Sequence, residues 1–226
     1  NVEKLQIVYS KSKEAVFLSH LDVMKVFEQA LSRADIPVMF SNGFNPRPEL
    51  VFAHPLSVGI ESTGEILEIK LSERVETSYL VKQLNRVLPN GLTVLSAEYV
   101  NPNSKSIMSR VYGATYIITL VYDEDKFKDK TKKQIENIKN SYKDKMETYL
   151  EQKNILVLKK SKNRMERIDI KGQIITYDFT LDGSLEITVL TGSKSNLKPD
   201  SIMTGYKEYI DENIEYNVKR TKILFK

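Results

Sequence analysis

Apolar residues recur at helical spacing in four segments of the chain. The clearest stripe consists of Leu21, Met24, Phe27, Leu31 and Ala34. These positions lie three or four residues apart, which predicts an amphipathic helix over residues 20–34. The same periodicity predicts helices over 77–88, 129–152 and 200–212. Ser19 is expected to cap the first helix, with Asp22 at its third position as in a capping box.

Between the helices, apolar and polar residues alternate as they do in half-buried strands. The predicted strands cover 4–10, 38–40, 50–56, 65–71, 92–100, 114–122, 155–160, 176–181, 185–189 and 216–225. The order strand–helix–strand–strand–helix–strand thus occurs twice. We therefore expect an α+β protein of two tandem ferredoxin-like (βαββαβ) modules, residues 1–106 and 107–226. The boundary falls in the polar stretch 101–113.

Two local features of this pattern carry specific expectations. A three-residue loop over 182–184 would pair Phe179 with Ile187 and keep the apolar side chains of both strands on one face. Glu65 and Glu68 are expected on a solvent face, where they would contribute solubility rather than acid–base chemistry.

Composition narrows the chemistry that the chain can perform. Its 226 residues are 41% hydrophobic and 28% charged, an ordinary globular mixture. There is no cysteine, and His20 and His54 are the only histidines. Disulfides, thiolate metal sites and a histidine-rich metal site are therefore excluded, and we expect neither a metal nor a cofactor. Without a long apolar run or a signal-peptide pattern, we expect a cytoplasmic protein with no membrane partner.

Positive charge is concentrated in the middle of the chain. The net charge is +4, whereas residues 123–167 alone hold 14 basic and 9 acidic side chains, a net +5. The candidate cations for RNA or partner binding are Lys159, Lys160, Lys162 and Arg164. Clustered cations bind phosphates by releasing counterions. The alternative is a solvated face, because acidic residues are interleaved with the basic ones.

Three stretches rich in turn-forming and polar residues stand out in the first half, at 19–22, 41–50 and 52–59. The candidate RNA-binding or partner-binding residues there are Ser19, Asp22, Asn42, Phe44, Asn45 and Arg47. An aromatic ring beside a guanidinium can stack a base and pair with a phosphate. The alternative is a loop clamped to its own sheet, with Phe44 buried and Arg47 paired with Glu49.

The two histidines are the candidate catalytic residues. His20 falls in the first turn of a predicted helix, where a neutral imidazole is favoured over an imidazolium. A metal-independent ribonuclease needs a base, an acid and a cation, which His20, His54 and Arg47 would supply. The alternative is that both histidines make structural hydrogen bonds.

Residues 17–71 contain the motifs SHLD at 19–22, GFNP at 43–46, PLSVG at 55–59 and ESTGE at 61–65. In these motifs, and in weaker matches at 168–172, 197–203 and 218–224, the chain resembles the radical-SAM-linked family of conserved hypothetical proteins. Asn42 and Arg47 depart from the family, which commonly has Gln and His there. The resemblance implies a companion domain of radical-SAM and cobalamin-type proteins, with no established activity. Since the chain lacks cysteine, we expect the radical-SAM partner to be encoded separately.

Three functions follow from these observations. We expect an accessory protein without catalytic activity that binds structured RNA, tRNA or rRNA, for modification or processing by a radical-SAM enzyme. A metal-independent endoribonuclease that uses His20 and His54 is the second possibility. The third is a protein-interaction module that docks the partner through the 41–59 region and binds no RNA. The sequence predicts no particular oligomeric state.

Overall fold

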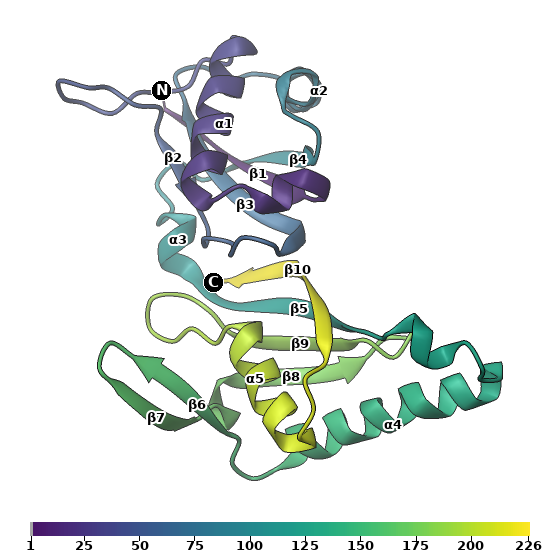
Figure 1. Cartoon of the computed structure of the whole chain (residues 1–226). Helices are drawn as coiled ribbons and strands as arrows, with labels where there is room; N and C mark the ends of the chain where they lie inside the picture. The colour runs from purple at the N-terminus through teal and green to yellow at the C-terminus, as the bar shows by residue number, and fades with distance from the viewer. Residues whose placement is uncertain (1) are drawn as a thin grey trace. The chain divides into compact units, whose positions relative to one another are not determined.

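The computed structural model describes residues 2–226 and has mixed α and β structure, which confirms the α+β class (Figure 1). The described chain divides into two compact units. Unit 1 runs to Gly113 and also includes Lys219–Lys226, and unit 2 is Ala114–Val218. The sequence boundary at 106/107 lies shortly before this division. The C-terminal residues return to the first unit, so unit 1 is discontinuous in sequence.

Unit 1 contains a sheet with its two longer helices on one face. In chain order its elements are β1 (Glu3–Lys11), η1 (Lys13–Phe17), α1 (His20–Arg33), β2 (Leu50–Phe52), β3 (Glu61–Leu71), α2 (Thr77–Val87), β4 (Leu92–Val100) and α3 (Ile107–Arg110). β1 lies between β4 and β3, antiparallel to both, and β2 pairs antiparallel with β3. The last part of β10 (Glu215–Phe225) runs parallel to the start of β3.

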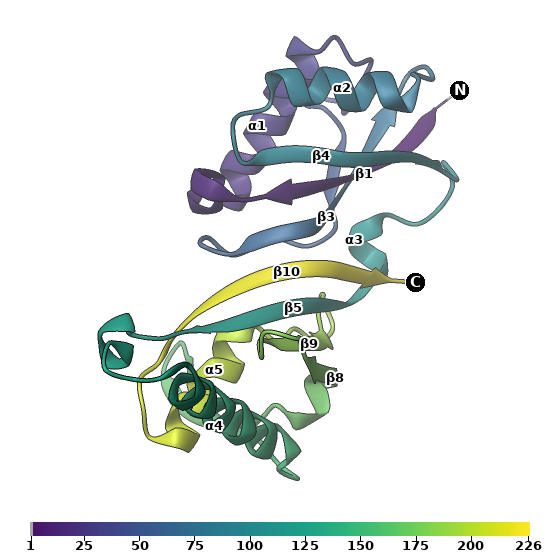
Figure 2. The ribbon, with the colours of Figure 1, turned by 90° about the vertical axis from the view of Figure 1, so that its right-hand side faces the viewer.

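The core of unit 1 lies between this sheet and the helices α1 and α2 (Figure 2). Inward side chains of β1 and β3 pack against the apolar stripes predicted for the two helices. The fully buried members of this core are Leu5, Ile7, Phe27, Leu31, Leu67, Leu71, Leu80 and Leu84. A smaller apolar cluster consists of Ala53, Ile66, Ile107 and Ile223. Unit 1 therefore has a main core of its own, as an independent domain requires.

Unit 2 follows a similar order with one added hairpin. Its elements are β5 (Val111–Val121), η2 (Glu124–Phe127), α4 (Lys132–Glu151), β6 (Leu156–Ser161), β7 (Arg164–Asp169), η3 (Lys171–Gln173), β8 (Ile174–Phe179), β9 (Leu185–Leu190), α5 (Pro199–Ile210) and the first residues of β10. The strands are ordered β10-β5-β9-β8, while β6 and β7 pair only with each other. Tyr149, Ile187, Ile202 and Tyr206 are central to its core.

The helices begin and end within three residues of the predicted bounds, whereas several strand predictions are wrong. Residues 38–40 form only isolated bridges, at Val38 and Phe40, rather than a strand. Phe179 pairs with Leu185 rather than with Ile187, because the turn spans residues 180–184. In this turn the Gly183 amide donates to the Thr180 carbonyl at 2.9 Å, and Gly183 takes a φ of +82°. A turn with glycine at that left-handed position is a common way to close such a hairpin. The strand β7 was also absent from the expected pattern.

The solvent face expected for Glu65 and Glu68 is wrong as well. Each residue is only 2% exposed. Both carboxylates are compensated by cations, as buried charges must be. Among the described residues, no helix has the length and apolar character needed to cross a membrane.

Candidate functional site

Residues 39–49 form a narrow arm of unit 1, here called the Phe44 arm, which projects beside β2 in Figure 1. Its two limbs are joined by a bridge between Phe40 and Pro48. Nearer the tip, the Ser41 amide donates to the Arg47 carbonyl at 2.8 Å, and the Arg47 amide donates to Ser41 Oγ at 3.1 Å. These bonds satisfy backbone groups of both limbs and set the path of the chain up to the tip.

The tip of the Phe44 arm presents its side chains to solvent. The Phe44 ring is fully exposed, and Asn42, Asn45 and Arg47 are exposed with it. Gly43 has a φ of +138°, a conformation that favours glycine. The alternative in which Phe44 is buried against its own sheet is therefore wrong. The arm instead offers an exposed aromatic ring and, three residues further along the chain, an exposed guanidinium.

Arg47 is not paired with Glu49 as that alternative required. The Glu49 carboxylate lies 2.9 Å from the Lys70 ammonium, on the neighbouring strand β3. No ion pair of Arg47 occurs within residues 2–226. Its charge is thus available to a ligand or a partner.

Ser19 and Asp22 form the capping box that the sequence predicted. The Asp22 amide donates to Ser19 Oγ at 3.1 Å, and the Ser19 amide donates to Asp22 Oδ2 at 3.1 Å. The Ser19 hydroxyl also donates to Asp22 Oδ2 at 2.8 Å, and this bond is the main cause of the lowered pKa of Asp22. The pair satisfies backbone donors at the start of α1 and places His20 as its first residue.

His20 is half-buried and packs edge-on against Phe52. The two ring centroids are 5.1 Å apart and the planes meet at 85°. Burial lowers the pKa of His20 from its usual 6.5, and the nearby Lys11 ammonium lowers it further. Lys11 is held in place by donating to the Leu18 carbonyl at 2.7 Å. The imidazole is therefore neutral at pH 7, the form that can accept a proton.

His54 follows β2, beside the middle of β3 and close in register to Glu65. Its carbonyl accepts a hydrogen bond from Arg220 Nη2 at 2.8 Å. The preceding amide, that of Ala53, donates to the Ile66 carbonyl at 2.9 Å. His20 reaches the same region through Phe52, so the two histidine segments both adjoin the middle of β3.

The Phe44 arm is attached near the C-terminal end of β3. The Met39 amide donates to the Lys70 carbonyl at 2.8 Å, whereas Ala53 pairs with Ile66. Four residues of strand separate these two points, which corresponds to about 13 Å. The Phe44 arm and the histidine segments are therefore attached to different parts of β3. Catalysis by His20 and His54 stays a prediction that cleavage assays of their alanine variants in EDTA would test.

The remaining candidate cations lie together on the β6–β7 hairpin of unit 2. Leu156 to Ser161 pair in register with Asp169 to Arg164. Its basic tip, defined as residues 159–164, contains four cations that are all exposed, namely Lys159, Lys160, Lys162 and Arg164. The tip contains no acidic residue, and Glu166 opposite Lys159 is the nearest one along the hairpin. Within the described chain none of the four cations forms an ion pair.

A family described as an uncharacterized protein conserved in bacteria (DUF2344) matches residues 4–199. The chain belongs to this family. No curated protein matches the DUF2344 chain. Among solved structures, a protein of unknown function from Galdieria sulphuraria aligns with 9% identity over 97% of this chain and 99% of its own, with a TM-score of 0.30. That TM-score is too low to assign a shared fold.

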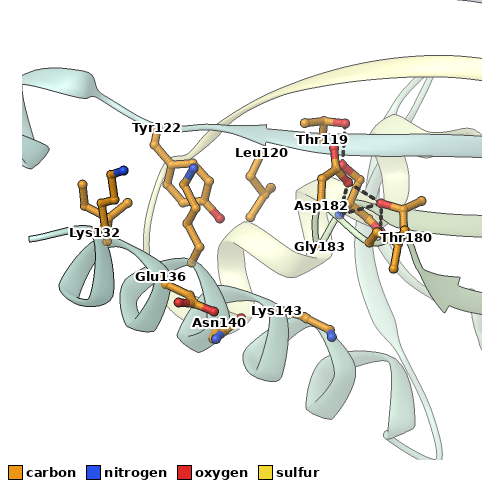
Figure 3. Close-up of a pocket in the computed structure, with 14 residues that line it drawn as sticks. Thr119, Leu120, Tyr122, Lys132, Glu136, Asn140, Lys143, Thr180, Asp182 and Gly183 are labelled. Carbon is orange, nitrogen blue, oxygen red and sulfur yellow. Dashed lines mark hydrogen bonds between the residues drawn. The ribbon is translucent and has the colours of Figure 1, made fainter.

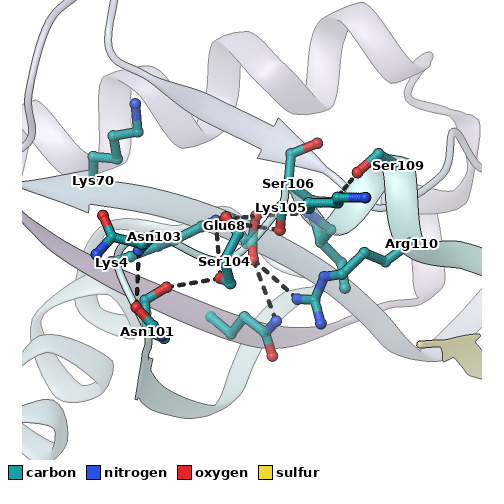
Figure 4. Close-up of polar contacts among 12 residues, drawn as sticks. Lys4, Glu68, Lys70, Asn101, Asn103, Ser104, Lys105, Ser106, Ser109 and Arg110 are labelled. Atoms are coloured by element: carbon teal, nitrogen blue, oxygen red, sulfur yellow. Dashed lines mark hydrogen bonds and ion pairs between the residues drawn. The ribbon is translucent and has the colours of Figure 1, made fainter.

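In this DUF2344 chain the buried carboxylate of Glu68 organises a polar cluster that sequence reasoning missed (Figure 4). It lies 3.5 Å from both the Lys4 ammonium and the Arg110 guanidinium. It also accepts from the Ile107 backbone amide at 2.8 Å and from the Gln6 side-chain amide at 3.3 Å. The only sequence signal for this cluster is the set of polar residues at alternating positions of β1 and β3.

A cavity of about 450 Å³ adjoins this cluster and is lined in part by Lys4, Glu49, Lys70 and Ser104. The Lys4 ammonium donates to the Ser104 carbonyl at 2.8 Å, and Lys70 is paired with Glu49. Each of its charged groups thus has a partner from the chain. The cluster is accounted for as a clamp that holds residues 101–110 on the sheet. Within residues 2–226 no three histidine, aspartate or glutamate side chains are grouped as a metal site needs.

Proposed function

We propose that the chain is an accessory protein that binds structured RNA, such as tRNA or rRNA, through the β6–β7 hairpin. The observation that carries this proposal is the basic tip, where four exposed cations stand within six residues without an intervening carboxylate. A two-stranded ribbon of this kind presents its charges on a narrow projection that can follow a phosphate backbone. Arg164 adds a planar donor group suited to bidentate contact with phosphate.

The Phe44 arm supplies a second element of the proposed function. A fully exposed ring at the tip of a bonded arm can stack on an unpaired base, while Arg47 contacts the adjacent phosphate. The same ring can instead insert into a pocket of a protein partner. Since the arm lies within residues 17–71, which carry the sequence resemblance, we propose a radical-SAM enzyme as that partner.

The proposal includes a ferredoxin-like architecture for each unit. It is supported by the order β4-β1-β3-β2 in unit 1, with antiparallel pairing throughout, and by the order β10-β5-β9-β8 in unit 2. In both units the strand that follows the second helix, β4 or β10, lies next to the first strand, β1 or β5. The β6–β7 hairpin is then an insertion into the second module, and insertions of this kind commonly carry function.

Retention of a structured RNA on a filter tests the proposal. We expect wild-type protein to retain the RNA at about 50 mM salt, and the variant Lys159→Glu, Lys160→Glu, Lys162→Glu, Arg164→Glu to lose that retention. The matched control reverses four exposed lysines elsewhere in unit 2, namely Lys126, Lys130, Lys133 and Lys153. Absence of retention by the wild type, or equal losses in the two variants, would overturn the proposal.

Phe44→Ala separates the two roles of the arm. If the ring stacks on RNA, the variant loses about 1–3 kcal/mol of RNA binding free energy. If the ring docks a protein, co-purification of the radical-SAM enzyme survives nuclease treatment with wild type and is lost with the variant. Tyr79→Ala, which removes an exposed aromatic ring from α2, is the control for a non-specific effect.

A further inference from the structure

The inward apolar stripe of α4 is less buried toward the N-terminus of the helix. In the C-terminal half, Met146, Tyr149 and Leu150 are buried in the core of unit 2. Nearer the N-terminus, the stripe continues as Ile135, Ile138 and Tyr142, which are only half-buried. Lys132, Lys139 and Lys143 flank this part of the stripe and line the space beside it.

These lysines line a groove of about 530 Å³ inside unit 2. α4 forms one wall, and the end of β5 together with the β8–β9 turn forms the other (Figure 3). Leu120 projects into it from β5, and Tyr122 projects into it from just beyond the end of β5. Thr180 and Leu181 line it from the turn. The volume is in the range of sites for small ligands.

The groove combines cations with flat and apolar surfaces. The Lys139 ammonium lies 5.4 Å from the centre of the Tyr122 ring. Leu181, at the turn, is fully exposed and has no packing partner to account for its apolar side chain there. Lys139 and Lys143 are one helical turn apart, a spacing at which like charges destabilise a helix. A bound anion would relieve that repulsion.

Acidic groups of the groove cancel this charge only in part. Asp182 accepts from the Ser184 amide at 3.1 Å and from the Thr180 hydroxyl, which hold its charged carboxylate in the turn. Together with Glu136 it offsets two of the three lysine charges. Glu136 stands between Lys132 and Lys139 on α4. The groove therefore retains a cationic excess on the helix and polar groups on both walls.

We propose that this groove binds a nucleoside phosphate. The phosphate would lie between Lys139 and Lys143, and the base would lie against Tyr122 and Leu181. The Asn140 side chain, which lines the groove between the two lysines, would donate to and accept from the edge of the base. A bare anion would leave the aromatic and apolar wall unused, and an uncharged ring would leave the ammonium groups unused.

The site is separate from the basic tip of the β6–β7 hairpin, and the proposal goes beyond RNA binding by that tip. The ligand is either a free nucleotide or a nucleotide of an RNA chain, and both have the same recognition chemistry. Isothermal titration of the full chain at low salt with four probes distinguishes the cases. The probes are uridine or adenosine 5′-monophosphate, the corresponding nucleoside, inorganic phosphate and a trinucleotide RNA.

We expect the monophosphate to bind at least tenfold more tightly than either the nucleoside or inorganic phosphate. Tighter binding of the trinucleotide would assign the site to RNA, and equal or weaker binding would assign it to a free nucleotide. Lys139→Ala with Lys143→Ala should weaken monophosphate binding at least tenfold, and so should Tyr122→Leu.

The matched control is Lys130→Ala with Lys133→Ala, which removes the same charge from exposed lysines that do not line the groove. It should leave binding within twofold of wild type. Binding of inorganic phosphate as tight as that of the nucleotide, no binding of either nucleotide, or equal effects of the two double variants would overturn the proposal. Because these titrations involve neither the basic tip nor a structured RNA, their outcome is independent of the filter-binding test.

Discussion

Arg220 of β10 and Glu65 of β3 form a two-pronged ion pair inside unit 1. Arg220 Nε donates to Glu65 Oε2 at 2.9 Å and Nη2 donates to Oε1 at 2.5 Å. The two side chains are 1% and 3% exposed. The pair joins the C-terminal strand to the first unit, and Arg220 also fixes the backbone of His54. The pair therefore links the two stretches of sequence that make up unit 1.

Removing one partner of this pair should strongly destabilise the protein. We expect Glu65→Ala or Arg220→Ala to lower the free energy of unfolding by about 3–5 kcal/mol, because the remaining charge is buried without compensation. The double variant should lose less than the sum of the two. Urea denaturation measures all three. The control is Lys219→Ala, whose exposed pair with Glu61 at 3.7 Å should contribute less than about 1 kcal/mol. Single losses as small as that of the control would contradict this account.

A side chain at Gly64 should also disturb the contact between β3 and β10. A Cβ at this position would clash with the Thr221 carbonyl oxygen and lie 3.3 Å from the Lys222 Cα. We expect Gly64→Ala to cost about 1–3 kcal/mol, the usual range for overpacking. Gly172→Ala, which meets no atom within 4 Å, serves as the control in the same thermal melt. A Gly64→Ala melt that matches the control would refute the expected clash.

Two phenylalanines that look alike in the sequence should differ in their contribution to stability. Phe27 is fully buried between Tyr9 and Phe52, at centroid distances of 4.8 and 6.0 Å. Phe179 only borders its core, with the Lys143 ammonium 5.2 Å from its ring. We expect Phe27→Ala to cost about 3–5 kcal/mol and Phe179→Ala clearly less, as measured by chemical denaturation. Equal losses would show that burial is not the deciding factor.

His20 should make stability depend on pH. Its pKa is lower in the folded protein than the usual 6.5, chiefly through burial, so the unfolded chain binds a proton more readily. The contribution of His20 to the free energy of unfolding should therefore be fully present above pH 6.5 and should be lost as the pH falls toward the pKa of the folded state. His20→Gln removes this contribution. In urea titrations at pH 7.5 and 5.5, wild type should lose more stability than the variant, and equal losses would contradict the expectation.

Helices were predictable because their signals are local. Ser19 and Asp22 lie three residues apart and mark the start of α1 without reference to the rest of the chain. The apolar periodicity predicts a start for α4 at residue 129, three residues before the start that its capping box, Thr131 with Gln134, sets. The β8–β9 register depended on the conformation of one turn, and the hydrogen bonds of Thr180 and Gly183 decided it.

The buried charges could not be predicted for a different reason. Glu65 and Arg220 are 155 residues apart in sequence, and each alone resembles an exposed surface charge. Only the return of β10 to unit 1 brings them together. Candidate binding residues such as Phe44 and Lys160 were easier to find, because an exposed loop or hairpin needs no distant partner. Their ligand depends on atoms outside the chain.

The most direct test of the central proposal is the salt dependence of RNA binding. The logarithm of the affinity of wild type should fall linearly with the logarithm of salt concentration. Each phosphate contact contributes roughly 0.7–0.9 to that slope, so loss of four contacts should reduce its magnitude by about 3. We predict this reduction for the variant Lys159→Ala, Lys160→Ala, Lys162→Ala, Arg164→Ala, and an unchanged slope for alanine at Lys126, Lys130, Lys133 and Lys153. Equal slopes for the two variants would contradict RNA binding by the basic tip.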